Sequence, residues 1–176
     1  MLFRSGFSTT DMGWLEFLLS KKLDLLSIHG RTAKQLSKVP ANWDLIGEAR
    51  QMRDSLSLST LIVGNGDVAN RASAEKLAEK YKLDGVMIGR GVFHDPFAFS
   101  KAQPWKDYTK QQKLELYKKH VELFAKTWKN NERKVETLNK FCKIYINGFD
   151  GASDLRVELM AAKSAAELRR ILEAAL

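Results

Sequence analysis

Two short apolar runs, each followed at once by a glycine-rich turn, constrain the fold of this chain more than any other feature of its sequence. The first run is residues 61–63, and its turn holds Gly64, Asn65, Gly66 and Asp67. The second run is residues 86–88, and its turn holds Gly89, Arg90 and Gly91. Unbroken apolar runs are typical of parallel strands that are covered on both faces. We therefore predict two neighbouring parallel strands whose carboxyl-terminal turns lie side by side.

The residues before these turns show the same alternation of strand and helix. Residues 23–28 predict a strand that ends at His29, and residues 1–6 predict the end of another strand. Candidate helix N-caps occur at residues 8–11 and at Asn42. Such alternation implies a parallel sheet with helical crossovers. A complete (β/α)8 barrel typically needs about 250 residues. A chain of 176 residues therefore predicts an α/β fold with an incomplete TIM barrel, about half of one.

The sequence pattern changes near residue 103, and no strand is predicted beyond it. Apolar residues recur at helical spacing, and a helix is predicted over residues 135–145. Two capping boxes open further helices, at Thr109 with Gln112 and at Ser164 with Glu167. We therefore predict two domains: residues 1–103 as the barrel part, and residues 104–176 as a small all-α helical bundle.

The net charge of +8 favours a polyanionic partner, and the excess is concentrated in the helical segment. Residues 104–176 hold 15 basic and 10 acidic residues. The candidate substrate-binding residues there are Lys126, Lys129, Arg133 and Lys134, and the aromatic residues Trp128 and Tyr145 are interleaved with the basic residues of this segment. Two interpretations stay open. These side chains form either the solvated surface of a helical core, or a nucleic-acid footprint in which basic groups neutralise phosphates.

A single cysteine and the lack of a long apolar segment limit the chemistry and the compartment. One cysteine cannot form an intrachain disulfide, and no stretch resembles a signal peptide or a spanning helix. We therefore predict a cytoplasmic protein with no membrane association. Cys142 lies within a predicted helix with no histidine near it in sequence, so we interpret it as a buried bystander. Neither metal-ligand spacing nor a nucleophile elbow occurs in the sequence.

The two glycine-rich turns supply the candidate cofactor site. Glycine lets backbone N–H groups approach a phosphate closely, and an arginine such as Arg90 adds a bidentate charge contact. The loops after strands 7 and 8 are the usual phosphate-binding place in a barrel, so we interpret these turns as a site for flavin mononucleotide (FMN). His29, at the end of a strand, could hydrogen-bond a flavin edge or a phosphate. Arg31 could reach a phosphate or a nucleotide, or pair with a carboxylate such as Asp44.

The same residues allow other interpretations. Gly64, Gly66 and Ala69 also fit the loose G-x-G-x-x-A pattern of a Rossmann motif, and Asp84 lies at a plausible distance for a ribose contact. The glycines of a Rossmann motif lead straight into the helix, whereas residues 70–73 intervene here. The pattern also recurs in weaker form after the next strand. The simplest alternative is that these glycines only make tight turns.

Taken together, these stretches resemble the C-terminal half of the tRNA-dihydrouridine synthase family. The matching motifs are His29-Gly30-Arg31-Thr32, Asn65-Gly66-Asp67-Val68, Gly89-Arg90-Gly91, Asp95-Pro96-Phe97 and Tyr145-Ile146-Asn147-Gly148-Phe149. Their order and spacing cover nearly the whole chain. The resemblance implies an FMN-dependent TIM barrel followed by a helical domain. It also implies reduction of uridine to 5,6-dihydrouridine in tRNA, with NADPH as the reductant.

The resemblance further implies roles for individual residues. The residues that would hold the phosphate and ribityl regions of FMN are Asn65, Gly66, Asp67, Gly89 and Arg90. His29 would lie beside the flavin, and the helical domain would help to bind tRNA. The family's catalytic cysteine lies in the barrel half that this chain lacks, so no catalytic residue is assigned to this chain. Arg4 matches an arginine of the family's strand 5, but Leu2 stands where the family has a flavin-contacting lysine.

These departures predict a fragment cut within strand 5 that is inactive alone. Exposed sheet edges would lead it to dimerise or aggregate. Two further functions stay open. One is another FMN-dependent TIM-barrel enzyme that acts on a small metabolite. Such an enzyme would not need a basic helical domain. The other is a non-catalytic RNA-binding module, which would bind RNA without affinity for flavin.

Overall fold

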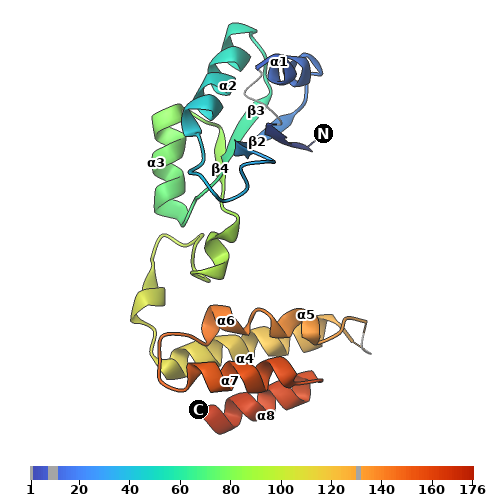
Figure 1. The fold of residues 1–176 in the computed structure, drawn as a ribbon, viewed down its shortest axis with the longest axis vertical. Coiled ribbons are helices and arrows are strands. Elements are labelled where there is room, and N and C mark those ends of the chain that lie inside the picture. The colour runs from blue at the N-terminus through green and yellow to red at the C-terminus, as the bar shows by residue number, and fades with distance from the viewer. Residues whose placement is uncertain (1, 8–11, 130–131) are drawn as a thin grey trace. The chain divides into compact units, whose positions relative to one another are not determined.

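The chain forms two compact units, Met1–Gln103 and Pro104–Leu176, in a computed structural model that describes residues 2–7, 12–129 and 132–176. The first unit alternates strands with helices, and the described part of the second unit contains helices and no strand (Figure 1). The boundary coincides with the change in sequence pattern near residue 103. The candidate N-caps at residues 8–11 lie outside the described residues.

Parallel strands form the sheet of the first unit, in the order β1-β2-β3-β4. They are β1 (Leu2–Phe7), β2 (Leu25–Thr32), β3 (Leu61–Asn65) and β4 (Gly85–Met87). His29 is in register with Asn65, and Asn65 is in register with Met87. The carboxyl ends of these three strands are therefore neighbours, as the sequence predicts. β2 extends past the predicted end because Thr32 pairs with Phe7 after a register shift.

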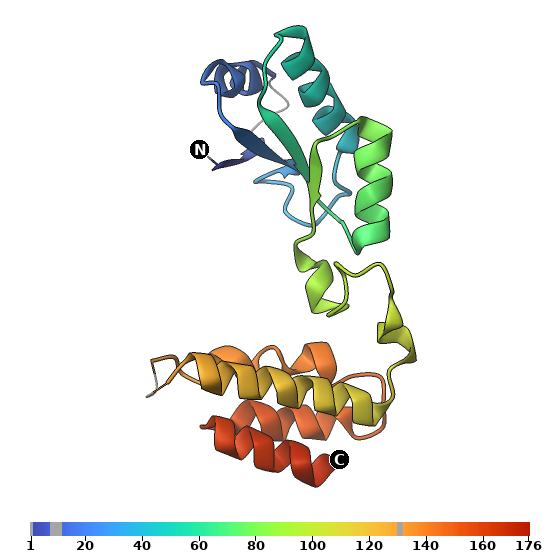
Figure 2. The same cartoon turned by 180° about the vertical axis from the view of Figure 1, so that it is seen from behind.

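Helices connect the strands and flank the sheet (Figure 2). They are α1 (Met12–Ser20), α2 (Trp43–Ser55) and α3 (Arg71–Tyr81). The core joins α1 and α2 to the central strands β2 and β3 through Leu15, Leu18, Leu19, Leu26, Ile28, Ile46, Ala49 and Ile62. Asn42 caps α2 as predicted, because its side-chain oxygen accepts hydrogen bonds from the backbone N–H groups of Asp44 and Leu45. Asn70 caps α3, so residues 71–73 belong to that helix and do not precede it.

The second unit is built from one long helix and several shorter ones. They are α4 (Lys110–Thr127), α5 (Glu136–Asn139), α6 (Cys142–Tyr145), α7 (Ala152–Ala161) and α8 (Ala165–Ala175). The 3-10 helix η2 (Pro104–Asp107) precedes α4, whereas the 3-10 helix η1 (Arg90–Phe93) belongs to the first unit and follows β4. The capping box of Thr109 with Gln112 is confirmed. At α8 only half of the prediction holds, since Ser164 accepts from the Glu167 N–H, but the Glu167 carboxylate accepts from the Lys163 N–H.

The single helix predicted over residues 135–145 is wrong, because the chain forms two short helices there. The backbone N–H of Phe141 donates to Leu138, and that of Ile144 donates to Phe141, so the helix tightens to i→i+3 bonds at the break. Asn139 is 2% exposed, and its side chain donates to the carbonyl of Ala162 at 2.8 Å. This hydrogen bond holds the break between α5 and α6 against the end of α7. Helical periodicity does not reveal a partner so distant in sequence.

Candidate functional site

A cavity of about 460 Å³ opens at the carboxyl ends of β2, β3 and β4. All six predicted cofactor-binding residues line this strand-end cavity: His29, Asn65, Gly66, Asp67, Gly89 and Arg90. Its volume falls within the range typical of small-ligand sites, roughly 300–1,000 Å³. The predicted juxtaposition of the two glycine-rich turns is confirmed. Their binding of a cofactor stays a prediction.

The turn after β3 is shaped by contacts that require glycine and fix its neighbour. Gly66 has a φ of +135°, and a Cβ there would lie 2.5 Å from the Cβ of Ala41. The indole N–H of Trp43 donates to the carbonyl of Gly66 at 3.1 Å. The side-chain amide of Asn65 donates to the carbonyl of Met87 at 3.0 Å, which ties this turn to β4. Position 66 therefore requires glycine, and this residue is among those that line the strand-end cavity.

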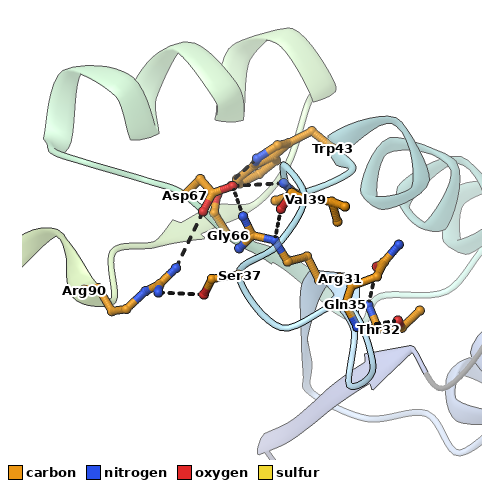
Figure 3. Close-up of polar contacts among 10 residues, drawn as sticks. Arg31, Thr32, Gln35, Ser37, Val39, Trp43, Gly66, Asp67 and Arg90 are labelled. Carbon is orange, nitrogen blue, oxygen red and sulfur yellow. Dashed lines mark hydrogen bonds and ion pairs between the residues drawn. The ribbon is translucent and has the colours of Figure 1, made fainter.

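Asp67 connects three segments around the strand-end cavity (Figure 3). Its Oδ2 accepts hydrogen bonds from the guanidinium of Arg31 and from the backbone N–H of Ala41, and its Oδ1 lies 3.7 Å from Nη2 of Arg90. Burial acts to raise the pKa of Asp67, but the hydrogen bonds from Arg31 and Ala41 and the charges of both arginines lower it on balance. An ionised carboxylate repels a phosphate. Asp67 therefore suits the orientation of Arg90 better than direct contact with an anion.

Arg31 is buried, with 7% of its surface exposed, and its guanidinium is bound within the protein. It donates to the carboxylate of Asp67 and to the carbonyl of Val39. The predicted pairing of Arg31 with a carboxylate is confirmed, but the carboxylate is that of Asp67 and not that of Asp44, which accepts from the hydroxyl of Tyr81 at 2.8 Å. Arg31 also lines a second cavity of about 420 Å³, so a substrate contact stays a prediction, but its hydrogen bonds favour a structural role.

Arg90 is the exposed cation of the site. Its side chain is 64% exposed, and it lines both the strand-end cavity and the second cavity. Nη1 donates to Oγ of Ser37 at 2.8 Å, so a hydroxyl and the Asp67 carboxylate together hold the guanidinium in place. Sequence reasoning missed Ser37, which lies in an irregular loop, and His94, which also lines the strand-end cavity. His94 follows Gly91 by three residues, and this closeness to the second glycine-rich turn is the sequence signal that could have found it.

Replacement of Asp67 by asparagine is expected to destabilise the first unit by about 1–3 kcal/mol, because it leaves the buried Arg31 guanidinium without its counter-charge. Urea unfolding at a constant m-value measures this loss. Glu75→Gln is the matched control, since Glu75 pairs with Arg71 on the exposed surface of α3 at 2.7 Å, and such a pair contributes about 0–1 kcal/mol. Equal destabilisation by the two changes would contradict the role assigned to Asp67.

The Rossmann interpretation fails on the position of Asp84. This residue precedes β4, so it lies at the amino ends of the strands, whereas the glycine-rich turns lie at the carboxyl ends. Its carboxylate accepts from the backbone N–H of Ile62 at 2.7 Å and from the guanidinium of Arg53 at 3.0 Å. A dinucleotide ribose at the glycine turns is therefore out of its reach.

In the second unit, the predicted basic residues divide into two groups. Lys129, Arg133 and Lys134 line a cavity of about 560 Å³ together with Trp128, which we call the helical-unit cavity. Lys126 is exposed on the last turn of α4 and is not among its lining residues. The sequence thus identified a basic cluster, but not which of its members share a cavity.

Cys142 and the search for metal ligands add no further site. Cys142 is 0% exposed, and burial raises the pKa of its thiol, which confirms the interpretation of a buried residue. Over the described ranges, no group of three or more His, Cys, Asp or Glu side chains is placed to hold a metal ion. In that same part of the chain, no helix combines the length and the apolar character needed to cross a bilayer.

Parallel strands, crossover helices and an arginine beside glycine-rich strand ends define an α/β protein with a candidate anion-binding edge. Residues 16–176 match the sequence model of the family described as dihydrouridine synthase (Dus). The chain belongs to this family.

Similar proteins carry the same assignment in their names. The chain is 45% identical over 160 residues to a probable tRNA-dihydrouridine synthase of Staphylococcus aureus (strain Mu50 / ATCC 700699), which covers 91% of this chain and 48% of that protein. It is 42% identical over 172 residues to probable tRNA-dihydrouridine synthase 2 of Bacillus subtilis (strain 168), which covers 97% of this chain and 52% of that protein. The chain therefore spans about half the length of the curated relatives it matches.

Proposed function

We propose that this chain is the cofactor-binding and RNA-binding part of an FMN-dependent tRNA-dihydrouridine synthase. Its first unit would be about half of a TIM barrel and its second a tRNA-binding helical bundle. The whole enzyme would reduce uridine in tRNA to 5,6-dihydrouridine, with NADPH as the reductant. The observation that carries the proposal is the strand-end cavity, in which two glycine-rich turns meet an exposed arginine. The names of the relatives supply the substrate and the reaction.

The residues around the strand-end cavity fit a phosphorylated flavin. A Cβ at Gly89 would meet only the side-chain amide of Asn65, at 3.9 Å, so the backbone there is open to a close ligand. Arg90 offers an exposed guanidinium for the phosphate, and Asp67 with Ser37 keeps it oriented. His29 and Asn65 add polar groups on the strand ends. A bound flavin would supply hydride transfer to the uracil ring, and these residues would bind and orient it.

The acid that protonates the reduced base would come from outside this chain. Cys142 is the single cysteine of the sequence, and it is fully buried in the helical unit, so it is not available to a substrate. We therefore expect no dihydrouridine synthesis by this chain alone. A tRNA substrate also supports the prediction of a cytoplasmic protein.

Self-association of the isolated chain is expected because β1 and β4 are the outer strands of the described sheet. An unpaired parallel strand leaves backbone N–H and C=O groups without partners, and pairing with a second copy satisfies them. Sedimentation equilibrium at micromolar concentration measures the mass. A folded monomer under those conditions would contradict the expectation.

FMN titration with flavin fluorescence as the readout tests the cofactor assignment, and riboflavin is the matched ligand that lacks only the phosphate. FMN is expected to bind at least about 10-fold more tightly than riboflavin, as a charge-assisted phosphate contact requires. Equal affinities would reject the phosphate site. Binding of an unmodified tRNA transcript without FMN affinity would favour the RNA-binding module, and FMN affinity without tRNA binding would favour a small-metabolite enzyme.

A further inference from the structure

We propose that the second unit holds a separate site for one unpaired nucleotide of an RNA, in the helical-unit cavity. The site lies where the end of α4, the start of α5 and the start of α8 meet (Figure 1). It rests on the proposed function only in taking RNA as the partner. It involves none of the residues of the strand-end cavity.

The charge of this cavity suits a phosphate. Four basic side chains line it: Lys129, Arg133, Lys134 and Lys163. The lining includes one carboxylate, that of Glu136, whose Oε1 lies 3.7 Å from Nζ of Lys163. The excess of positive charge is therefore not neutralised within the cavity. Its volume of about 560 Å³ lies in the range that accommodates small ligands.

Trp128 distinguishes this cavity from a simple basic patch. It is the C-cap residue of α4 and remains 39% exposed. The guanidinium of Arg133 lies over its ring, with the central carbon 4.9 Å from the ring centre, so the guanidinium already contacts one face of the indole. Nucleobases stack on aromatic rings and on arginine planes, and this is how proteins hold unpaired nucleotides.

The other tryptophan of this unit shows the contrast. Trp105 is 7% exposed, and its ring packs against those of Tyr108 and Tyr145 at 5.4 and 6.3 Å between centroids. Trp105 therefore belongs to the core of this unit, and its ring is not accessible to a ligand. Trp128 remains partly exposed, with the Arg133 guanidinium over its ring and three lysines lining the same cavity. This combination of stacking planes and charge points to a nucleotide and not to an acidic peptide.

The base-dependent part of the binding is tested with two probes of equal charge, a six-nucleotide oligouridylate and an abasic ribose-phosphate oligomer of the same length. The full chain is expected to prefer the oligouridylate by about 5- to 100-fold, the effect of one stacked base. Trp128→Ala is expected to abolish this preference, and Trp128→Phe to retain most of it. Trp14→Ala, which removes an exposed tryptophan of the first unit, is the control.

The charge-dependent part is tested by the salt dependence of oligouridylate binding. Lys129→Ala and Lys134→Ala are each expected to reduce the slope of log K against log salt by about 0.7, the value for one phosphate of a single strand that is no longer neutralised. Lys119→Ala is the matched control, because it removes the same charge from the exposed surface of α4 and Lys119 does not line the cavity. Circular dichroism confirms that each variant is folded.

Four results would overturn the proposal. They are a base preference that survives Trp128→Ala, an equal slope change in Lys119→Ala, equal competition by polyglutamate of the same length, and no binding of oligouridylate at low salt. FMN affinity is measured on the same samples and is expected to be unchanged in Trp128→Ala. A wild-type chain without FMN affinity that still shows the base preference would reject the flavin assignment and leave this site standing.

Discussion

Arg90→Ala is expected to weaken FMN binding by about 10- to 100-fold and to leave riboflavin binding nearly unchanged, because hydrogen bonds to a charged group contribute about 1.5–3 kcal/mol. The two ligands differ only in the phosphate, so the effect isolates that contact. Flavin fluorescence titration of both ligands gives the two dissociation constants. The exposed position of Arg90 makes a large loss of stability unexpected.

Arg71→Ala is the control for this change, since Arg71 is an exposed arginine that pairs with Glu75 on α3 and does not line the strand-end cavity. Its removal is expected to leave both affinities as they are. Loss of FMN and riboflavin binding to the same degree in Arg90→Ala would mean that Arg90 supports the turn instead of the phosphate.

Gly91→Ala is expected to lower the stability of the first unit, whereas Gly89→Ala is expected to lower ligand affinity at nearly unchanged stability. A Cβ at Gly91 would lie 2.4 Å from the carbonyl oxygen of Ala69 and 2.8 Å from that of Val68. These are backbone atoms that cannot rotate away, so Gly91→Ala is expected to destabilise the first unit by about 1–3 kcal/mol. At Gly89 the nearest heavy atom is 3.9 Å away, so alanine there is expected to change stability by less than about 0.5 kcal/mol.

The second quantity to compare between the two glycine variants is their affinity for FMN. Gly89 lines the strand-end cavity, so a methyl group there is expected to lower FMN affinity in a protein of unchanged stability. Urea unfolding and FMN titration on both variants provide the measurements. Equal losses of stability at the two positions would show that the turn adjusts as a whole, and an unchanged FMN affinity in Gly89→Ala would place the ligand elsewhere.

The placement of the predicted cofactor-binding residues was predictable because parallel strands bring their carboxyl ends to one edge. Asn65 and Arg90 follow neighbouring strands, and that topology alone puts them beside one cavity. The particular carboxylate that pairs with Arg31 was not predictable. Asp67 lies 36 residues away, and nothing in the sequence favours it over Asp44. Long-range charge partners are chosen by loop geometry, which local patterns do not encode.

The helical unit shows the same limit. The caps at Thr109 and Ser164 follow from bonds within a few residues, and the sequence identifies both. The break after Asn139 depends on carbonyls at the end of α7, and the cavity beside Trp128 depends on the position of α8. Tertiary contacts decide both features, so periodicity alone predicts one continuous helix and an undivided basic surface.

The bond between Arg53 and Asp84 has a practical consequence for protein engineering. Arg53 also donates to the carbonyl of Thr60, so one guanidinium fastens α2 to the entry of β3 and of β4. The opposite extremity of those strands is organised by Asp67 and Arg90. Neither Arg53 nor Asp84 lines the strand-end cavity, so substitutions at this pair are expected to change the stability of the first unit without altering the cavity lining.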